Sequence, residues 1–519
     1  MSTSNQEESI PAATKVSAVI VLAAGHGTRM KSHTSKLLHK VAGKSMLSYA
    51  VQAAQSLQPD HLVVVVGHGR EQVQSHLAEI APDATVAVQA EQLGTGHAVR
   101  CGLEALPSEA RGNVVVTYAD VPMLSGQTLN ELVRTHAQQS NAVTVLTAQL
   151  DDPTGYGRVV RDNGRVLRIV EHKDADPDEL FITEVNSGIY VFDSQVLRDG
   201  LAQIDQHNSQ HELYLTDVVE YANHIGRVVG AFQTNDAWQT MGVNDRLQLA
   251  RMNTEVNRRI CEKWMLEGVT IADPASTWIE DDVTLEADVT LLPCTQLLGA
   301  TSVASGAVIG PDTTLKDVEV GQGARVLRTH GELSVIGPNT DVGPWARLRP
   351  GTELGENGKI GTFVETKNAK IAAGSKVPHL SYCGDAILGE GVNIGAGTIF
   401  ANYDGSHKST THLGDDVFIG SNSVLVAPVD IGSGAFVAAG STITDDIPAG
   451  ALAVARGRLH ISQGWVAKRR PGTKADLAAS ADPGGIHPAV QASRDILAAD
   501  ARTADARRAG TRPTAADTH

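Results

Sequence analysis

Aliphatic residues recur at every sixth position over much of the C-terminal half of this 519-residue chain. An α-helix repeats about every 3.6 residues and a strand about every two, so neither sustains a period of six. The repeat occurs in three runs, and many of its members are followed by glycine. The members are Ile279, Leu285, Leu291, Leu297, Val303, Ile309 and Leu315, then Ile336, Val342, Leu348, Leu354 and Ile360, and finally Leu413, Ile419, Leu425, Ile431, Val437 and Ile443.

A six-residue period is typical of a three-sided parallel β-solenoid, in which each unit forms one flat side. The aliphatic residue of each unit then points inward, and the next residue sits at a corner, where glycine is well tolerated. Chance spacing does not explain three such runs. We therefore predict a left-handed parallel β-helix of hexapeptide repeats over residues 269–460. The stretches 316–335 and 401–412 are out of phase, and we expect them to be loops that leave the coils.

An α/β pattern precedes the repeat. Short apolar segments rich in β-branched residues, at 16–22, 61–66, 113–118 and 142–148, alternate with stretches of helical period. This alternation predicts a Rossmann-like α/β domain around a mostly parallel sheet over residues 15–246. Residues 247–268 are expected to form a helical linker. Residues 1–14 are expected to be flexible, and residues 461–519, which have few large apolar side chains, to be mostly disordered.

Composition narrows the functional classes. The net charge of −16 argues against nucleic acid as the main partner, because affinity for the phosphate backbone needs clustered Lys and Arg. The four cysteines lie far apart and form no CxxC pair, so neither a disulfide framework nor a zinc site is indicated. No apolar run approaches ~20 residues, and the polar start lacks the layout of a signal peptide. We expect a cytoplasmic protein that needs neither membrane nor nucleic acid.

The first predicted strand runs into the glycine-rich stretch LAAGHGTRM at residues 22–30. A Walker A loop is excluded, because Leu38 stands where its first glycine would precede Gly43-Lys44-Ser45. The dinucleotide fingerprint GxGxxG also fails, since Met30 takes the place of its third glycine. What remains is a glycine turn whose backbone N–H groups can face a phosphate chain, with Arg29 and Lys36 to neutralise it. A tight strand-to-helix turn with two solvated cations is the alternative.

Further motifs follow in order: QAEQLGTGHA at 89–98, YADVPML at 118–124, PTGYGR at 153–158, IVEHKDA at 169–175, EVNSGIY at 184–190, YLTD at 214–217 and GVNDR at 242–246. Together with LAAGHGTRM they resemble the signature of the sugar-1-phosphate nucleotidyltransferases. With the hexapeptide repeats and NYDG at 402–405, the chain up to about residue 470 is similar to a bifunctional bacterial family. Its members combine N-acetylglucosamine-1-phosphate uridyltransferase with glucosamine-1-phosphate N-acetyltransferase activity.

This resemblance implies Mg²⁺-dependent uridylyl transfer from UTP to N-acetylglucosamine-1-phosphate in the N-terminal domain. Such a transfer is an in-line attack on the α-phosphorus that releases pyrophosphate, and the protein mainly positions anions and stabilises charge. Two protein oxygens suit Mg²⁺, which keeps waters and takes further ligands from phosphates. The implied residues are Leu22, Ala23, Ala24, Gly25, Gln89, Gly94 and Thr95 for the nucleotide, Arg29 and Lys36 for the phosphates, Tyr118, Ala119, Gly157, Glu171 and Asn186 for the sugar, and Asp120 and Asn244 for the metal.

For the second activity, an amine must attack the thioester of acetyl-CoA, which needs a base, oxyanion donors and cations for a sugar phosphate. The resemblance implies that His379 is the general base. It implies a homotrimer with this site between subunits, and UDP-N-acetylglucosamine, a precursor of cell-wall polymers, as the product. The implied ligands are Arg349, Lys367, Tyr382 and Asn393 for glucosamine-1-phosphate, and Ala396, Asn402, Tyr403, Ser421, Ala439 and Arg456 for acetyl-CoA, with Trp465 as a further candidate.

Three alternatives stay open. The β-helix could be only a trimerisation or regulatory module behind a single nucleotidyltransferase activity. The chain could be a non-catalytic scaffold of nucleotidyltransferase descent. It could also be a metal hydratase of the γ-carbonic anhydrase type, because His407 and His412 form a spaced pair, although a third ligand is not evident.

Overall fold

The computed structural model describes residues 14–67, 70–108, 110–482, 484 and 488–510. Its contacts divide the chain into two compact units, Met1–Ala455 and Arg456–His519, which are described in turn. Apart from Thr14, the N-terminal segment expected to be flexible lies outside the described residues.

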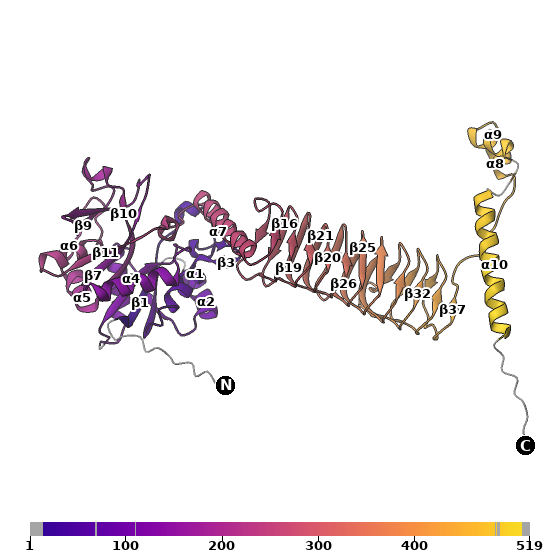
Figure 1. The fold of residues 1–519 in the computed structure, drawn as a ribbon, viewed down its shortest axis with the longest axis horizontal. Coiled ribbons are helices and arrows are strands. Elements are labelled where there is room, and N and C mark those ends of the chain that lie inside the picture. Colours follow the sequence, from indigo (N-terminus) through magenta and orange to yellow (C-terminus); the bar gives the residue numbers. More distant parts are fainter. Residues whose placement is uncertain (1–13, 68–69, 109, 483, 485–487, 511–519) are drawn as a thin grey trace, which may run out of the picture. The chain divides into compact units, whose positions relative to one another are not determined.

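The first unit begins with an α/β domain around a sheet that runs in the order β11-β7-β10-β6-β1-β4-β5, with β8 and β9 at its side (Figure 1). Most neighbours in this order are parallel, and β10 is antiparallel to both β6 and β7. The four strands expected from the sequence are confirmed as β1, β4, β6 and β7. The bounds are β1 (Val16–Ala23), β4 (His61–Val66), β5 (Thr85–Val88), β6 (Asn113–Tyr118), β7 (Val143–Gln149), β8 (Arg158–Asp162), β9 (Arg165–Val170), β10 (Glu184–Asp193) and β11 (Val229–Thr234).

Helices cover both faces of this sheet, so every residue of β1 is buried. All of them except Ser17 are apolar, as expected for a parallel sheet. One apolar core joins the sheet to α3, α5 and α6, and the other joins it to α1, α2 and α4. The bounds are α1 (Met46–Gln55), α2 (Arg70–Ile80), α3 (Thr95–Glu104), α4 (Gly126–Gln138), α5 (Ser194–Gln203) and α6 (Asp217–His224).

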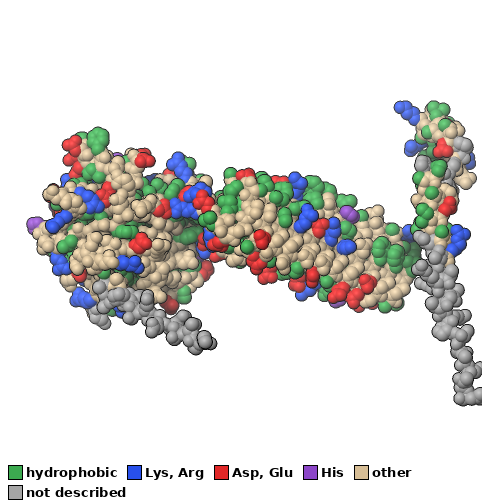
Figure 2. All heavy atoms as spheres, viewed as in Figure 1, with side chains coloured by type: hydrophobic (Ala, Val, Ile, Leu, Met, Phe, Trp, Pro, Cys, Tyr) green, Lys and Arg blue, Asp and Glu red, His purple; other side chains and the backbone are tan. Residues whose placement is uncertain are grey.

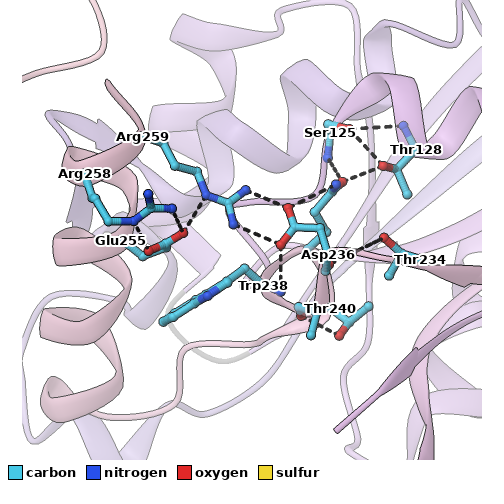
Figure 3. Close-up of polar contacts among 11 residues, drawn as sticks. Ser125, Thr128, Thr234, Asp236, Trp238, Thr240, Glu255, Arg258 and Arg259 are labelled. Atoms are coloured by element: carbon cyan, nitrogen blue, oxygen red, sulfur yellow. Dashed lines mark hydrogen bonds and ion pairs between the residues drawn. The ribbon is translucent and has the colours of Figure 1, made fainter. Parts of the chain in front are cut away.

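A 21-residue helix, α7 (Arg246–Leu266), follows the α/β domain where the sequence predicts a helical linker. Polar contacts hold it to the domain (Figure 3). The Arg259 guanidinium forks onto the Asp236 carboxylate at 2.6 and 2.9 Å and also donates to Glu255. The pKa of Asp236 is lowered, mainly by this fork. Because the fork is bidentate, it fixes the direction in which α7 leaves the domain.

A three-sided parallel β-helix follows α7, and its coils stack along one axis (Figure 1). All aliphatic residues of the three six-residue runs are buried in one continuous core, which confirms the predicted repeat. The first face comprises β12 (Thr270–Ile271), β15 (Thr290–Leu291), β18 (Val308–Ile309), β20 (Arg325–Val326), β22 (Asp341–Val342), β25 (Lys359–Thr362), β27 (Lys376–His379), β29 (Asn393–Ile394), β32 (Phe418–Ile419), β35 (Phe436–Val437) and β37 (Leu452–Ala453).

The second and third faces share long strands that bend around their common corner. These strands are β19 (Thr313–Val320), β21 (Thr329–Ile336), β26 (Glu365–Ile371) and β28 (Tyr382–Leu388). Strands of the second face alone are β13 (Trp278–Ile279), β16 (Thr295–Leu298), β23 (Ala346–Leu348), β30 (Ile399–Ala401), β33 (Val424–Val426) and β36 (Thr442–Ile443). Strands of the third face alone are β14 (Thr284–Leu285), β17 (Ser302–Val303), β24 (Glu353–Leu354), β31 (Thr411–Leu413) and β34 (Val429–Ile431).

The expectation that residues 316–335 leave the coils is wrong, because β19 and β21 run through much of this stretch. Leu315 pairs with Leu297, and Val320 pairs with Val303. The corner between these faces is therefore one residue shorter than in the preceding coil, and Asp317 turns it with a φ of +53°. A shorter corner shifts the phase of the sequence repeat without inserting a loop.

The other out-of-phase stretch does leave the coils. Asn393 on β29 pairs with Phe418 on β32, so this coil is seven residues longer than three six-residue units. The extra residues lie between β30 and β31, where Tyr403 and Lys408 form an isolated antiparallel bridge. The loop therefore folds back on itself, and it carries the NYDG motif.

The second unit differs from the expected mostly disordered tail. Its described part contains α8 (Trp465–Arg469), α9 (Lys474–Ala481) and α10 (Pro488–Gly510). No side chain of α8 or α9 is buried. High helix propensity of the many alanines and the Thr473 N-cap account for local helix without a core. Nowhere in the described chain is a helix both long and apolar enough to span a bilayer.

Candidate active sites

A cavity of about 440 Å³ opens at the carboxyl ends of β1 and β6, where open α/β sheets bind ligands. It brings together twelve of the residues predicted from the sequence: Leu22, Ala23, Ala24, Gly25, Arg29, Lys36, Gln89, Gly94, Thr95, Tyr118, Asp120 and Asn244. It is also lined by His26, Gly27, Thr28, Leu37, Gln92, Ala98 and Glu212, which sequence reasoning missed. Most of these lie inside the quoted motifs, whereas no local signal marks Glu212.

Two oxygens in the lining of this cavity converge on one cation. The Lys36 ammonium, in the short helix η3 (Lys36–Leu38), lies 2.5 Å from Asp120 Oδ2 and 2.8 Å from Asn244 Oδ1. A carboxylate and an amide oxygen that share a cation within these distances are the hard donors that Mg²⁺ prefers. Asp120 and Asn244 therefore fit the predicted metal site, because their oxygens stabilise a positive charge at the position of the Lys36 ammonium.

Two glycines shape the cavity wall. Gly27 has a φ of +61°, and a Cβ there would lie 2.6 Å from Lys36 Cβ. Gly94 has a φ of +108°, and its Cβ would lie 2.6 Å from the Leu213 carbonyl oxygen. Only glycine allows both the left-handed backbone and the close approach at these positions.

The predicted sugar residues Gly157, Glu171 and Asn186 form a separate group beside the cavity. The Asn186 N–H donates to the Gly157 carbonyl at 2.9 Å. A Cβ on Gly157 would lie 3.5 Å from both Glu171 Oε1 and Asn186 Cβ. The Asn186 side-chain oxygen accepts from the Gly188 N–H and the Tyr190 hydroxyl, which orients the amide. Ala119 differs from expectation, because it is fully buried and does not line the cavity.

The electrostatics of this group are acidic. Burial raises the pKa of Glu171, and the charges of Asp174, Asp217 and Glu212 raise it further. Burial also raises the pKa of Asp217, to about 6, with smaller contributions from neighbouring carboxylates. Among the described residues, neither carboxyl group has a basic partner that offsets the loss of hydration. Glu171 therefore presents a largely desolvated carboxyl group at this site.

A larger cavity of about 750 Å³ beside α1 and α2 contains none of the predicted residues. The Lys44 ammonium is held by Asp281 at 2.6 Å and Asp282 at 2.8 Å. The Ser45 hydroxyl is bonded to His76 Nε2 at 2.8 Å. Because these polar groups already satisfy one another, volume alone does not make this cavity a substrate site.

In the β-helix, cations gather around one buried carboxylate. Asp385 is 8% exposed and accepts hydrogen bonds from the side-chain amides of Asn368 and Asn402, while Lys367 Nζ lies 3.8 Å away. Burial would raise the pKa of Asp385, but the two amides, Lys367 and Lys408 lower it further than burial raises it. This carboxylate is therefore ionised and anchors the cations around it.

Positive charge nevertheless exceeds negative charge at this point. The close approach of the Lys408 ammonium, burial, and the charges of Lys408 and Arg349 lower the pKa of Lys367, and Asp385 only partly opposes this. Lys408, on the loop between β30 and β31, is a residue that sequence reasoning missed. Arg349 is paired with Glu365 at 3.0 Å. Three neighbouring cations form a site that suits a phosphate monoester.

His379 ends β27 beside this cluster. Its carbonyl accepts from the Gly397 N–H at 3.1 Å and the Ser381 hydroxyl at 2.7 Å, so its backbone is fixed. The ring itself is exposed and makes no hydrogen bond with a described residue. It is thus available to a substrate as an acceptor of a proton.

The other predicted acetyltransferase residues occupy the same coils or the next ones. The Tyr382 hydroxyl lies 3.5 Å from the Asn402 amide, and Asn393 begins β29. Tyr403 is exposed on the loop, with its hydroxyl bonded to the Gly405 carbonyl at 2.6 Å. The backbones of two more are tied across coils, since the carbonyls of Ala396 and Ser421 accept hydrogen bonds from the N–H groups of Asn422 and Gly440. The remaining residue of this set in the first unit is Ala439, whereas Arg456 and Trp465 belong to the second unit.

The histidine pair does not assemble a metal site within one chain. His412 lies exposed on β31, and His407 lies in the loop before it, near Asp404 at 3.9 Å. The described residues contain no group of three His, Cys, Asp or Glu side chains placed to hold a metal ion. The hydratase alternative therefore lacks its third ligand here.

Comparison with known proteins gives matches in both halves of the chain. Residues 18–256 match the Nucleotidyl transferase family, and residues 410–445 match the Bacterial transferase hexapeptide (six repeats) family. The bifunctional protein GlmU of Pseudarthrobacter chlorophenolicus is 56% identical over 91% of this chain and 97% of the relative. Those of Kineococcus radiotolerans and Streptomyces avermitilis are 54% and 52% identical over 89% and 90% of this chain, and over 94% and 97% of their own lengths.

Proposed function

Because the chain belongs to the GlmU family of bifunctional proteins, we propose that its two groups of residues are the sites of two successive reactions. The chain is an enzyme that acetylates glucosamine-1-phosphate with acetyl-CoA and then transfers uridylyl from UTP to the product, making UDP-N-acetylglucosamine. The observation that carries our assignment of sites is the presence, in one chain, of the Lys36, Asp120 and Asn244 cluster and of the cationic cluster beside His379.

We assign uridylyl transfer to the cavity at the carboxyl ends of β1 and β6. The backbone of residues 22–25 and the Gln89 amide would hold the nucleotide, and Arg29 and Lys36 would neutralise its phosphates. An oxygen of the sugar phosphate then bonds to the α-phosphorus of UTP, while the bond to pyrophosphate breaks. Lys36 stabilises charge on that pentacoordinate centre in a site partly shielded from water.

Asp120 and Asn244 are the residues that would hold Mg²⁺. When bound, the ion offsets charge on the triphosphate and on the departing pyrophosphate. Gly157, Glu171 and Asn186 would hold the N-acetylglucosamine moiety on the side of the cavity, with Tyr118 between sugar and nucleotide. These residues orient the sugar phosphate for in-line attack.

We assign acetyl transfer to the β-helix. Arg349, Lys367 and the neighbouring Lys408 would bind the phosphate of glucosamine-1-phosphate. The amine nitrogen of the substrate bonds to the acetyl carbonyl carbon, and the His379 imidazole takes a proton from that amine. The carbon–sulfur bond then breaks, and CoA leaves as a thiolate to which the His379 imidazolium returns the proton. Asn402 and Tyr403 lie on the loop where acetyl-CoA would bind.

The acetyltransferase residues lie on an open surface of one chain, which supports a homotrimer with the site between subunits. Trp345, Phe363 and Leu380 occupy equivalent corner positions of successive coils and are each more than half exposed. The rings of Trp345 and Phe363 stack at 5.3 Å. Hydrophobic side chains also reach the surface at several places along the β-helix in Figure 2. Leu380 follows His379, so covering this ridge would enclose the base.

Both reactions consume UTP or acetyl-CoA, and we place them in the cytoplasm, where these substrates are made. The test uses purified full-length protein with glucosamine-1-phosphate, acetyl-CoA, UTP and Mg²⁺, and it records free CoA and pyrophosphate separately. Wild type should release both. Chelation of Mg²⁺ should abolish pyrophosphate release and leave CoA release intact.

Two variants separate the sites. Asp120→Asn should stop pyrophosphate release and spare CoA release. His379→Gln should stop CoA release and spare pyrophosphate release when N-acetylglucosamine-1-phosphate is supplied ready-made. His330→Gln, an exposed histidine on the same β-helix, is the matched control and should change neither. If CoA never appears while ready-made N-acetylglucosamine-1-phosphate still yields pyrophosphate, the β-helix is only a structural module.

A further inference from the structure

Arg158 is a buried charge with no carboxylate within ion-pair distance among the described residues, although its charge acts on the exposed Asp152. Arg158 is 1% exposed and has the largest of the fully buried side chains among the described residues. It forms no ion pair with a described residue, and its Nε has no hydrogen-bond partner there. Burying an unpaired guanidinium is costly. An arginine kept under these conditions needs a reason that packing alone does not supply.

The register of three strands places Arg158 directly next to the sugar group. It follows Gly157 in the chain, and it pairs with Val170 of β9 and Val185 of β10. Glu171 and Asn186 are the next residues after those two valines. Because adjacent residues of a strand point to opposite faces, Arg158 lies behind the surface that Gly157, Glu171 and Asn186 present.

Arg158 also ties together the two segments that flank this surface. Its Nη1 donates to the Tyr156 carbonyl, in the turn before Gly157. Its Nη2 lies 3.4 Å from His172 Nδ1, in the residue after Glu171. A guanidinium can only donate hydrogen bonds, so Nδ1 of His172 is the acceptor and the ring hydrogen resides on Nε2.

We propose that Arg158 is a positioning residue for N-acetylglucosamine-1-phosphate, acting by clamping the Tyr156–Gly157 turn to the Glu171–His172 segment. It does not touch the substrate. It fixes the distance between the Gly157 backbone and the Glu171 carboxylate, which together form two sides of the sugar site. A planar fork serves here because Nη1 and Nη2 donate in fixed directions from two separate atoms, whereas all donors of an ammonium lie on one nitrogen. This inference rests on the proposed sugar site.

The test compares steady-state constants of the full-length enzyme for both substrates of uridylyl transfer. Arg158→Met should raise KM for N-acetylglucosamine-1-phosphate about 10- to 100-fold, with KM for UTP and kcat changed less than about threefold, because only the sugar site loosens. Arg158→Lys should give a smaller rise. His172→Ala removes one of the two bonds and should raise the same KM about fivefold. The double variant should be no worse than Arg158→Met.

Arg161→Met is the matched control, since Arg161 lies on the same strand and pairs with Glu184 at the surface. It should leave KM for the sugar phosphate unchanged. CoA release by each variant reports whether the rest of the chain is folded. Equal rises in KM for UTP and for the sugar phosphate would overturn the proposal, as would an unchanged sugar KM in His172→Ala and Arg158→Lys. Absence of UDP-N-acetylglucosamine from wild type would instead refute the proposed function.

Discussion

The two catalytic regions assemble their residues in different ways. In the α/β domain, Lys36 reaches Asp120 across 84 residues of sequence and Asn244 across 208. In the β-helix, the polar partners Arg349 and Glu365 are 16 residues apart, and Asp385 and Asn402 are 17 apart. One site therefore depends on the whole sheet, whereas the other depends on a few stacked coils.

This contrast extends to the cores. The α/β domain has two apolar cores, one on each side of a single sheet, and the β-helix has one core in which each coil contacts its neighbours. In a stacked architecture, damage is felt mainly by adjacent coils. The two activities should therefore respond separately to mutations, and the following predictions test that separation.

The largest effect is expected from truncating a buried aromatic side chain in each region. Phe400 and Phe192 are both fully buried, in the β-helix and the α/β domain respectively. Each change to alanine should cost about 3–5 kcal/mol of stability by leaving a cavity. Thermal inactivation of CoA release should shift more in Phe400→Ala, and that of pyrophosphate release more in Phe192→Ala. If both activities are lost together in both variants, the two regions unfold as one.

A second pair separates backbone strain from site geometry. Gly27 and Gly434 have φ values of +61° and +67°, but a Cβ on Gly434 meets nothing within 4 Å. Alanine at either position costs about 1–2 kcal/mol of strain. Gly27→Ala should also displace Lys36 and slow pyrophosphate release about 10- to 100-fold, while Gly434→Ala leaves it unchanged. Similar rates in both variants would show that Lys36 tolerates displacement.

Asp385 tests the charge network of the β-helix. Its pKa is lowered by its partners, so its stabilisation is fully present above the unfolded pKa of about 4 and is lost as pH falls through the lower folded pKa. Asp385→Asn should reduce the stability of this region by about 1–3 kcal/mol at neutral pH. The new side-chain NH₂ group would then face the amide and ammonium donors that bind the carboxylate. The deficit should shrink below about pH 4. A deficit independent of pH would contradict an ionised carboxylate here.

Asp217 should show a smaller effect of opposite sign. Burial raises its pKa from 3.8 to about 6, so ionisation destabilises the fold increasingly from about pH 4 to pH 6 and fully above that range. Asp217→Asn should stabilise the α/β domain by about 1 kcal/mol at pH 8, allowing for partial exposure. Calorimetry should find no gain at about pH 4. A gain that persists at acid pH would refute this cause.

Much of the fold was predictable because its periodicity is local. The six-residue repeat predicted the buried face of the coils, and the apolar segments predicted β1, β4, β6 and β7. The loop predicted at 316–335 is wrong, because the loss of one corner residue interrupts the six-residue period just as an inserted loop would. The second unit also departs from its prediction of disorder, because α8 and α9 form without burying any side chain, and the scarcity of large apolar residues does not exclude such helices.

The sequence by itself predicted most residues of both candidate sites, because glycine turns, lysines and carboxylates occur in recognisable order along the chain. Tertiary structure alone decided how they meet. The convergence of Asp120 and Asn244 on Lys36 depends on the alignment of β1 and β6 and on the direction of α7. Lys408 joins the β-helix cations because the extended loop folds back. Arg158 is buried behind the residues of the proposed sugar site because β8, β9 and β10 pair in one register. Contacts between strands that are distant in sequence cannot be read from the order of residues.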